Sequence, residues 1–308
     1  MLSSKIIITG ATGFIGRHLT YALIDTGFKV IVFSRNPSYS SKLIPAAYQH
    51  VKWDSLKPEE WQDYLEDSLG VINLAAAPLT GKKWTDEYKK EIVFSRVIST
   101  ANIANAILNT KNPPDFFISV SAVGYYGNTI SEVDEDSGKG KGFLSDVCKQ
   151  WEDAAMLAKP KTRVVTPRLG IVLDSTEGAL AKMLTPYKFF IGGPLGNGKQ
   201  WVSWIHILDA LNLLLLCVEK DTIEGPINLV SPNPVDMNDF ARAIGRAMKK
   251  PVFMRMPETL IKFWFGEAAS VLLDGQKVIP KKALDSGYKF EFSYPYTAIL
   301  DVIKHKSI

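Results

Sequence analysis

The chain of 308 residues is 46% hydrophobic and 22% charged, which is enough apolar sequence to bury one large domain core together with a smaller lobe. Its net charge of +4 is not gathered into a basic block, so the composition gives no indication of a nucleic-acid partner. The two cysteines, Cys148 and Cys217, lie far apart and have neither the spacing of a metal site nor that of a disulfide framework.

The first predicted elements are a strand over residues 5–9, a glycine-rich turn and a helix. In this order, the spacing of Gly10, Gly13 and Gly16 is typical of a dinucleotide-binding site. The first glycine allows the turn, the second lets the main chain approach a pyrophosphate, and the third lets the helix pack closely on the sheet. The N–H groups at the helix N-terminus can then bind the phosphates. The alternative is a glycine-rich turn without a ligand. We predict cofactor contacts from Gly10, Thr12, Gly13, Phe14, Ile15 and Gly16.

Strands and helices alternate along the following sequence. Buried strands are predicted at residues 29–33, 51–53, 70–74, 116–120 and 163–166, and helices at residues 85–108 and 143–158. This alternation predicts a parallel sheet with helices on both faces. Right-handed crossovers place the ligand crevice at the carboxyl ends of the strands. The predicted fold class is α/β, a doubly wound parallel Rossmann sheet with a smaller mixed C-terminal lobe.

The alternation ends near Leu173. We therefore predict an NADP-binding Rossmann core over residues 1–173 and a substrate-binding C-terminal lobe over residues 174–308. One strand, at about residues 227–230, is expected to return to the core sheet. The acidic and glycine-rich stretch 132–142 is typical of a solvated, mobile flap, and its functional version would be a lid over the substrate.

The end of the second strand indicates which dinucleotide is bound. A site for NAD places an acidic residue about twenty positions after the glycines, where it accepts hydrogen bonds from the ribose 2′-hydroxyl. Here Ser34 and Arg35 end the strand, and no acidic residue lies between Asp25 and Asp54. A guanidinium can pair with a 2′-phosphate and Ser34 can add a hydroxyl donor, so NADP(H) is favoured. Asp54 is placed to accept from the adenine amino group. The alternatives are a solvent-facing Arg35 and a helix-capping Asp54.

Two motifs carry a resemblance to a known family. Residues 9–16 and 73–76 resemble the cofactor loop and the fourth-strand motif of the extended short-chain dehydrogenase/reductase superfamily. Further stretches are similar to its atypical branch of epimerase-family proteins, within the NAD-dependent epimerase/dehydratase family; some members are labelled cell-division inhibitors. These stretches are residues 121–127, 151–152, 167–170, 192–196, 204–206 and 275–280.

The resemblance covers nearly the whole chain and implies further cofactor contacts. The fourth-strand motif passes the adenine ribose, the helix after it reaches the cofactor in this branch, and the exit of the sixth strand passes the nicotinamide side. The contacts implied in this way are Leu74, Ala75, Ala76, Glu91, Arg96 and Val172.

The departure from the family concerns catalysis. The usual reaction needs a tyrosine as acid/base, a lysine four residues later whose charge lowers the tyrosine pKa, and a serine or threonine that orients the substrate. The helix expected to carry this pair contains no tyrosine. Counted from Glu152, the pair falls on Leu144 and Cys148; counted from Lys149, the tyrosine position falls on Ser145.

Other side chains could replace the missing pair. Tyr125 or Tyr126, which follow the fifth strand at the crevice, could supply a phenol. Lys149 could supply a charge and Ser121 a hydroxyl partner. The alternative is that both tyrosines only wall the nicotinamide pocket, where aromatic side chains are common.

The sequence therefore favours an NADP(H)-dependent oxidoreductase or epimerase that acts on an unidentified small molecule. The rival hypothesis is a non-catalytic, NADP(H)-responsive regulatory protein, which the missing pair favours. The longest apolar run, residues 210–218, is too short to span a bilayer, and Met1 to Ser4 leave no room for a signal peptide. We expect a cytoplasmic protein without metal, membrane or nucleic-acid partners; a homodimer is left open.

Overall fold

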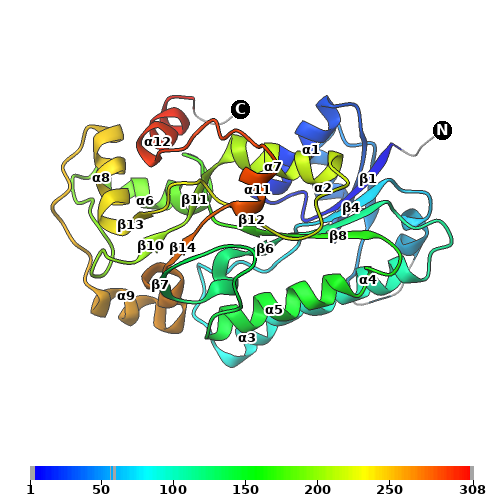
Figure 1. The fold of residues 1–308 in the computed structure, drawn as a ribbon, viewed down its shortest axis with the longest axis horizontal. Coiled ribbons are helices and arrows are strands. Elements are labelled where there is room, and N and C mark those ends of the chain that lie inside the picture. The colour runs from blue at the N-terminus through cyan, green and yellow to red at the C-terminus, as the bar shows by residue number, and fades with distance from the viewer. Residues whose placement is uncertain (1–3, 56, 58–59, 306–308) are drawn as a thin grey trace.

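The computed structural model describes residues 4–55, 57 and 60–305, so Met1 to Ser3, which entered the expectation about a signal peptide, lie outside the described residues. A parallel sheet of seven strands forms its centre, in the order β12-β8-β5-β4-β1-β2-β3, and the short β6 pairs with β8 off this path (Figure 1). The strands are β1 (Lys5–Thr9), β2 (Lys29–Ser34), β3 (Gln49–Lys52), β4 (Gly70–Asn73), β5 (Phe116–Ser119), β6 (Ser121–Ala122), β8 (Arg163–Leu169) and β12 (Gly225–Leu229).

Both faces of the sheet are buried, which explains why its strands are almost continuously apolar. In β1, Ile6 and Ile8 belong to one core cluster and Ile7 belongs to the cluster on the other face, because successive side chains of a strand point to opposite sides. The helices α1, α2 and α7 cover one face, and α4 and α5 cover the other (Figure 1). The fold class predicted from the sequence is confirmed.

The helices of the described chain carry the connections between strands and most of the C-terminal lobe. Their bounds are α1 (Phe14–Asp25), α2 (Pro37–Leu43), α3 (Asp86–Val93), α4 (Ser99–Leu108), α5 (Phe143–Met156), α6 (Gly178–Lys188), α7 (Ile207–Glu219), α8 (Met237–Met248), α9 (Glu258–Phe265), α10 (Ser270–Leu273), α11 (Lys281–Asp285) and α12 (Pro295–Lys304). Shorter helical turns are η1 (Glu60–Leu65), η2 (Phe94–Ile98), η3 (Val123–Tyr126) and η4 (Gly266–Ala269). Among the described residues, no helix is both long enough and apolar enough to cross a bilayer.

Three two-stranded sheets extend the core into the C-terminal lobe. They pair β7 (Thr129–Val133) with β14 (Gln276–Val278), β9 (Ile171–Leu173) with β11 (Trp204–His206), and β10 (Trp201–Val202) with β13 (Val235–Asp236). The lobe has its own apolar cluster, in which α6, α8 and α12 meet around Trp204 and Phe240. The strand expected at about residues 227–230 is β12, which pairs with β8 at the edge of the central sheet.

The structure refines two expected elements. The helix predicted over residues 85–108 is divided into α3 and α4 by the π-helical turn η2. The acidic stretch after β7 is docked and is not a free flap, because the Glu135 Oε1 atom accepts hydrogen bonds from the main-chain N–H groups of Asn228 (2.8 Å) and Lys282 (3.2 Å). Glu135 is buried, so this contact fastens the stretch to β12 and α11.

A buried polar network joins the central strands to the helices beneath them. The Thr9 hydroxyl donates to Asn73 Oδ1 (2.6 Å), and Asn73 Nδ2 donates to the hydroxyls of Thr100 (2.8 Å) and Ser119 (3.3 Å). The indole of Trp151 also donates to the Thr100 hydroxyl (2.9 Å). The network therefore links β1, β4, β5, α4 and α5 just below the edge of the sheet at which the strands end.

Replacing Asn73 by alanine should lower the free energy of unfolding by roughly 2–4 kcal/mol, because it leaves several buried hydroxyl groups without partners. Urea unfolding followed by circular dichroism measures this loss. Thr26→Ala is the control: the Thr26 hydroxyl bonds to helix carbonyls at an exposed position, so its removal should cost less than about 0.5 kcal/mol. Equal losses in the two variants would show that the Asn73 network does not stabilise the fold.

Candidate cofactor-binding and active site

The glycine turn lies at the point where the strand order reverses, between β1 and β4. Gly10 has a φ of 69°, and a Cβ atom there would lie 2.7 Å from the carbonyl carbon of Leu74 and 2.8 Å from the nitrogen of Ala75. Only glycine permits this approach and this backbone conformation. In a doubly wound sheet, ligands bind at such a switch point, outside the carboxyl ends of the strands. The structure thus brings together the predicted contacts Gly10, Leu74 and Ala75.

The start of α1 is open toward this crevice. Gly13 is the N-cap of α1 and has no side chain, so the first-turn N–H groups of Phe14, Ile15 and Gly16 have no side-chain acceptor at this position. Among the described residues, apart from its two chain neighbours, a Cβ atom on Gly13 would meet only the Gly10 oxygen (3.2 Å) within 4 Å, so the turn is open on this side. A Cβ on Gly16 would collide with the same oxygen, which explains the close packing of α1. This geometry fits a phosphate group at the helix N-terminus.

Interactions of Arg17 with two segments that are distant in the sequence hold the glycine turn in place. Arg17 of α1 donates to the Thr12 carbonyl oxygen (3.1 Å) and forms an ion pair with Glu177, the N-cap of α6. Beside it, a Cβ atom placed on Gly178 would lie 3.3 Å from the Phe14 ring and 3.6 Å from the Val172 carbonyl oxygen. Val172 is therefore located near the start of α1, although it is far from it in the sequence.

The side chains expected at the ribose lie at the ends of β2 and β3. Arg35 directly follows β2, is exposed, and has no ion-pair partner in the described part of the chain. The Ser34 hydroxyl accepts from the Asn36 N–H (3.2 Å), which fixes the turn after β2. Asp54 lies just after β3 and is half-buried. The guanidinium of Arg35 is thus left available to an anion outside the sheet edge.

Arg96 is a buried cation without a carboxylate partner among the described residues. It belongs to the π-helical turn η2 and is only 8% exposed. Its guanidinium lies over the Trp151 ring at 5.3 Å and donates to the Ile92 carbonyl oxygen (3.3 Å), and burial lowers its pKa. Such π-helical turns are frequently found at functional sites. Two other contacts implied by the resemblance are exposed. They are Glu91, near the end of α3, and Ala76, after β4.

Ser121 and Cys148 meet where the usual catalytic pair is missing. The Ser121 hydroxyl is fully buried and makes no hydrogen bond of normal geometry with a described residue, although the Cys148 thiol lies beside it. Burial and the charge of Glu152 raise the pKa of Cys148 to about 11, while Ser121 and Arg96 partly oppose this shift. The thiol is therefore protonated near neutral pH, and the charge of Arg96 reaches it.

The two tyrosines have different surroundings. The Tyr126 hydroxyl donates to Asn228 Oδ1 and accepts from Arg168 (both 2.8 Å), and burial raises its pKa to about 12. Arg168 in turn forms a buried, bidentate ion pair with Glu152. The Tyr125 ring stacks on the Arg168 guanidinium at 3.5 Å, but no hydrogen bond from a described residue reaches its hydroxyl. Tyr126 is thus held in place by two hydrogen bonds, whereas the Tyr125 hydroxyl forms none with a described residue.

Lys149 is held by an ion pair on the surface of α5. Its ammonium donates to both carboxylate oxygens of Asp153, one turn further along α5, at 2.6 and 2.5 Å, and the side chain is half-exposed. This ion pair raises the pKa of Lys149 and keeps its charge on the outer face of the helix. The geometry gives Lys149 no contact with Ser121.

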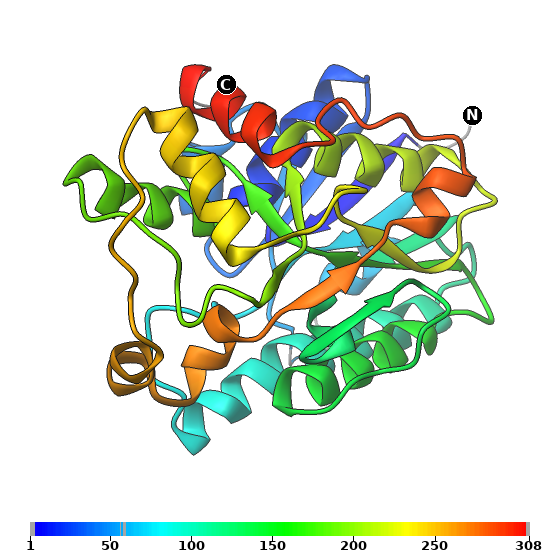
Figure 2. The same ribbon diagram turned by 60° about the vertical axis from the view of Figure 1, so that its left-hand side comes forward.

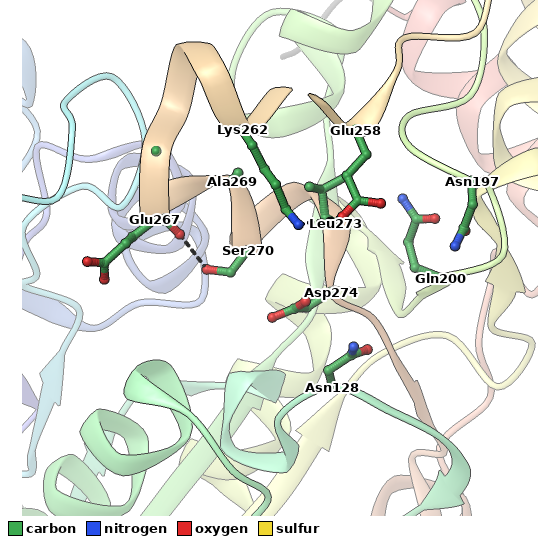
Figure 3. Close-up of a pocket in the computed structure, with 11 residues that line it drawn as sticks. Asn128, Asn197, Gln200, Glu258, Lys262, Glu267, Ala269, Ser270, Leu273 and Asp274 are labelled. Atoms are coloured by element: carbon green, nitrogen blue, oxygen red, sulfur yellow. Dashed lines mark hydrogen bonds and ion pairs between the residues drawn. The ribbon is translucent and has the colours of Figure 1, made fainter. Parts of the chain in front are cut away.

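The C-terminal lobe contains a hollow of about 650 Å³, within the usual size range for small-molecule sites. Lys262 and Glu258 project into it from α9 and face Asp274 and Asn128 (Figure 3). Glu258 pairs with Lys262 (2.6 Å), and burial raises the pKa of Asp274. Asn128 lies two residues after Tyr126, so the hollow adjoins the tyrosine segment.

Several residues that build the site were absent from the sequence-based list. They are Thr9, Arg17, Asn73, Thr100, Cys148, Glu152, Arg168 and Glu177. The Trp-Glu and Pro-Arg stretches within the resemblance already contained Glu152 and Arg168, but only the fold shows that the two side chains meet. No signal in the sequence links Arg17 to Glu177.

Comparison with known proteins agrees with this architecture. A profile of the NAD dependent epimerase/dehydratase family matches residues 6–142, and a domain of unknown function, DUF1731, matches residues 256–302. The epimerase family protein SDR39U1 of Mus musculus is 36% identical over 304 residues, which cover 97% of this chain and 99% of that protein. YfhF of Bacillus subtilis is 36% identical over 294 residues, or 94% of each chain.

Two solved structures are similar over almost the full length. Human epimerase family protein SDR39U1, crystallised with NADPH, has a TM-score of 0.87 and 32% identity, covering 97% of this chain and 99% of that one. UDP-glucuronic acid 4-epimerase from Bacillus cereus, in complex with UDP-glucuronic acid and NAD, has a TM-score of 0.75 at 20% identity, covering 98% and 99%; this likeness concerns the fold alone.

The sequence motifs, the glycine cradle and the relatives thus agree along nearly the whole chain, and the resemblance read from the sequence is confirmed. The chain belongs to the NAD dependent epimerase/dehydratase family, in its branch of SDR39U1-like epimerase family proteins.

Proposed function

We propose that this protein binds NADP(H) and uses it in an oxidoreductase or epimerase-like reaction on a small molecule. The main support for the proposal is the open glycine turn at Gly13. There the N-terminus of α1, which has no side-chain cap, lies at the point where the strand order of the sheet reverses. The NADPH complex of human SDR39U1, a protein 32% identical to this chain, supports the choice of cofactor.

Each end of the cofactor has a set of residues suited to hold it. The turn and α1 would bind the pyrophosphate through Thr12, Gly13, Phe14 and Ile15, and the Leu74 to Ala76 segment would pass the ribose. Arg35 and Ser34 would bind the 2′-phosphate, with Asp54 toward the adenine. Glu91, Arg96 and Val172 would line the nicotinamide half. When bound, the nicotinamide supplies or accepts the hydride.

Within the protein, Tyr125 is the best candidate for handling the proton. No described residue forms a hydrogen bond with its hydroxyl, and its ring lies over the Arg168 guanidinium at 3.5 Å. Tyr126, Ser121 and Lys149 remain candidates, but Tyr126 has two hydrogen-bond partners already and Lys149 is paired with Asp153. The buried charge of Arg96 would stand in for the usual lysine.

The substrate would occupy the hollow that begins at Asn128. Its lining is rich in amide, carboxylate and ammonium groups, among them Gln200, Lys262 and Asp274. Such a lining suits a polar molecule that carries several hydrogen-bonding groups.

A non-catalytic, NADP(H)-responsive regulatory protein is the second candidate. It is favoured by the lack of the tyrosine and lysine pair on α5 in either register, and by the buried hydrogen bond between Tyr126 and Asn228. Such a protein would keep the cradle and show no turnover.

Arg35→Glu should weaken NADPH binding by at least about tenfold and NADH binding much less, because the new carboxylate repels only the 2′-phosphate. Fluorescence titration with both nucleotides measures the two dissociation constants. Lys29→Glu, a change at the other end of β2, is the control. Similar losses for NADPH and NADH would reject Arg35 as the 2′-phosphate contact.

If the protein is an enzyme, Tyr125→Phe should lower kcat by roughly 10²–10⁴, the usual contribution of a general acid or base. Lys149→Met should lower it by less than about threefold, because the Lys149 ammonium is held by Asp153. Cofactor oxidation in a screen of carbonyl compounds measures these rates. Turnover that survives in the Tyr125, Tyr126 and Lys149 variants would eliminate all three residues as catalytic candidates. A complete lack of turnover in the wild type would favour the hypothesis of a regulatory protein.

Arg96→Met should raise the pKa of the Cys148 thiol further, because the guanidinium charge stabilises the thiolate. The protonated thiol reacts poorly, so alkylation of Cys148 at a fixed pH near 9 should slow by about three- to tenfold. Mass spectrometry after timed alkylation measures the rate, and Arg96→Lys, which keeps the charge, should behave more like the wild type. An unchanged rate in Arg96→Met would show that the charge of Arg96 does not reach this site.

A further inference from the structure

One edge of the C-terminal lobe exposes large apolar side chains from three segments. Phe263, Phe189 and Phe253 are 76%, 70% and 68% exposed. In Figure 2 the end of α6, the chain between α8 and α9, and α9 itself follow the left-hand edge of the molecule. We name this surface the aromatic edge; its apolar members are Phe189, Phe190, Ile191, Phe253, Met254, Leu260, Phe263 and Trp264.

Helix α9 is apolar on its outer face. Leu260, Phe263 and Trp264 are spaced three and four residues apart, so they form one stripe, and all three are exposed. The inner face buries Ile261. A helix at the surface of a globular protein usually turns its polar side outward. The outer stripe of α9 is therefore suited to burial against something outside the chain.

The other two segments of the edge are fixed side by side. Leu195 and Met256 form a parallel β-bridge, and the Gly196 N–H donates to the Met256 carbonyl oxygen (2.9 Å). The Lys250 ammonium lies over the Phe190 ring at 3.7 Å. The loop after α6 and the segment before α9 thus form one continuous surface.

The charged side chains around this surface are mostly cations without acidic partners. Lys188, Lys249, Lys250 and Arg255 form no ion pair within residues 4–55, 57 and 60–305. Two nearby carboxylates are already paired, Glu258 with Lys262 and Glu267 with Lys89, and Asp274 lines the hollow. The aromatic edge is therefore apolar at its protruding tips and positively charged at its base.

We propose that the aromatic edge binds the surface of an anionic lipid membrane. Aromatic and leucine side chains on a short helix, with lysine and arginine beside them, match the requirements of the interface: the rings enter the boundary between headgroups and acyl chains, and the cations remain at the level of the phosphates. The sequence-based expectation of no membrane partner rested on the lack of an apolar run long enough to span a bilayer. The apolar side chains of the aromatic edge come from separate parts of the chain, so the search for such a run does not detect them.

The charges argue against the other occupants. In a twofold dimer through this edge, the cations Lys188, Lys249, Lys250 and Arg255 would face their own copies, which is unfavourable. An acidic protein surface would satisfy the cations, but it would need a shape complementary to three protruding rings. A fluid lipid surface accommodates separate apolar tips without such a match.

Co-sedimentation of the full chain with lipid vesicles tests the proposal. Vesicles of phosphatidylcholine with about one-third phosphatidylserine should bind at least about tenfold more protein than phosphatidylcholine alone, and the excess should decline as salt is raised. Phe253→Ala with Phe263→Ala, and separately Lys249→Glu with Lys250→Glu, should each reduce binding by about tenfold or more.

Tyr39→Ala is the matched control, because Tyr39 is an exposed aromatic residue on α2, at the other side of the molecule (Figure 1). It should bind vesicles as the wild type does, and circular dichroism of every variant should show the wild-type fold. Vesicle binding that is absent, or that persists in the Phe253 and Phe263 variants, would overturn the proposal. So would a dimer in analytical ultracentrifugation that these substitutions dissociate, or binding to soluble polyglutamate without binding to vesicles.

Discussion

The close approach of the Gly10 turn to the backbone of Leu74 and Ala75 is the constraint on which the site depends. It joins the ends of β1 and β4 at the reversal of the strand order and leaves no room for a side chain. The Thr9 hydroxyl reinforces it by accepting from the Ala75 N–H (3.3 Å) while donating to Asn73. With both strand ends held in this way, the N-terminus of α1 remains open toward the crevice.

Buried side chains gather where the family resemblance leads us to expect the usual proton-transfer pair. Counted from Glu152, the lysine position falls on Cys148, and burial keeps the thiol of this residue protonated by raising its pKa to about 11. Two arginines supply positive charge from other elements: Arg96 from the π-helical turn before α4, and Arg168 from β8. Arg168 is neutralised by Glu152, whereas Arg96 has no carboxylate partner in the described chain. This difference makes Arg96 the cation that is available to a bound molecule.

The fold and the cofactor loop could be predicted because they depend on local patterns. The run from Lys5 to Gly16 contains a strand, a turn and a helix start whose spacing follows from backbone geometry alone. The buried group around α5 could not be predicted in this way. Ser121, Cys148 and Arg96 lie on three elements, and their contacts arise only when α5 and η2 pack beneath the sheet. The sequence offered Lys149 as the charge, but a one-position difference on α5 turns that side chain outward to Asp153.

The sequence by itself determined the alternation of strands and helices, the glycine cradle and the family, because periodicity and short motifs are set by neighbouring residues. Tertiary structure alone decided which charges are paired and which are free. It joined Arg17 to Glu177, docked Glu135 on β12, separated the roles of Tyr125 and Tyr126, and turned the apolar stripe of α9 outward. These outcomes depend on which surfaces meet between segments that are far apart in the sequence, and a local pattern contains no information about such contacts.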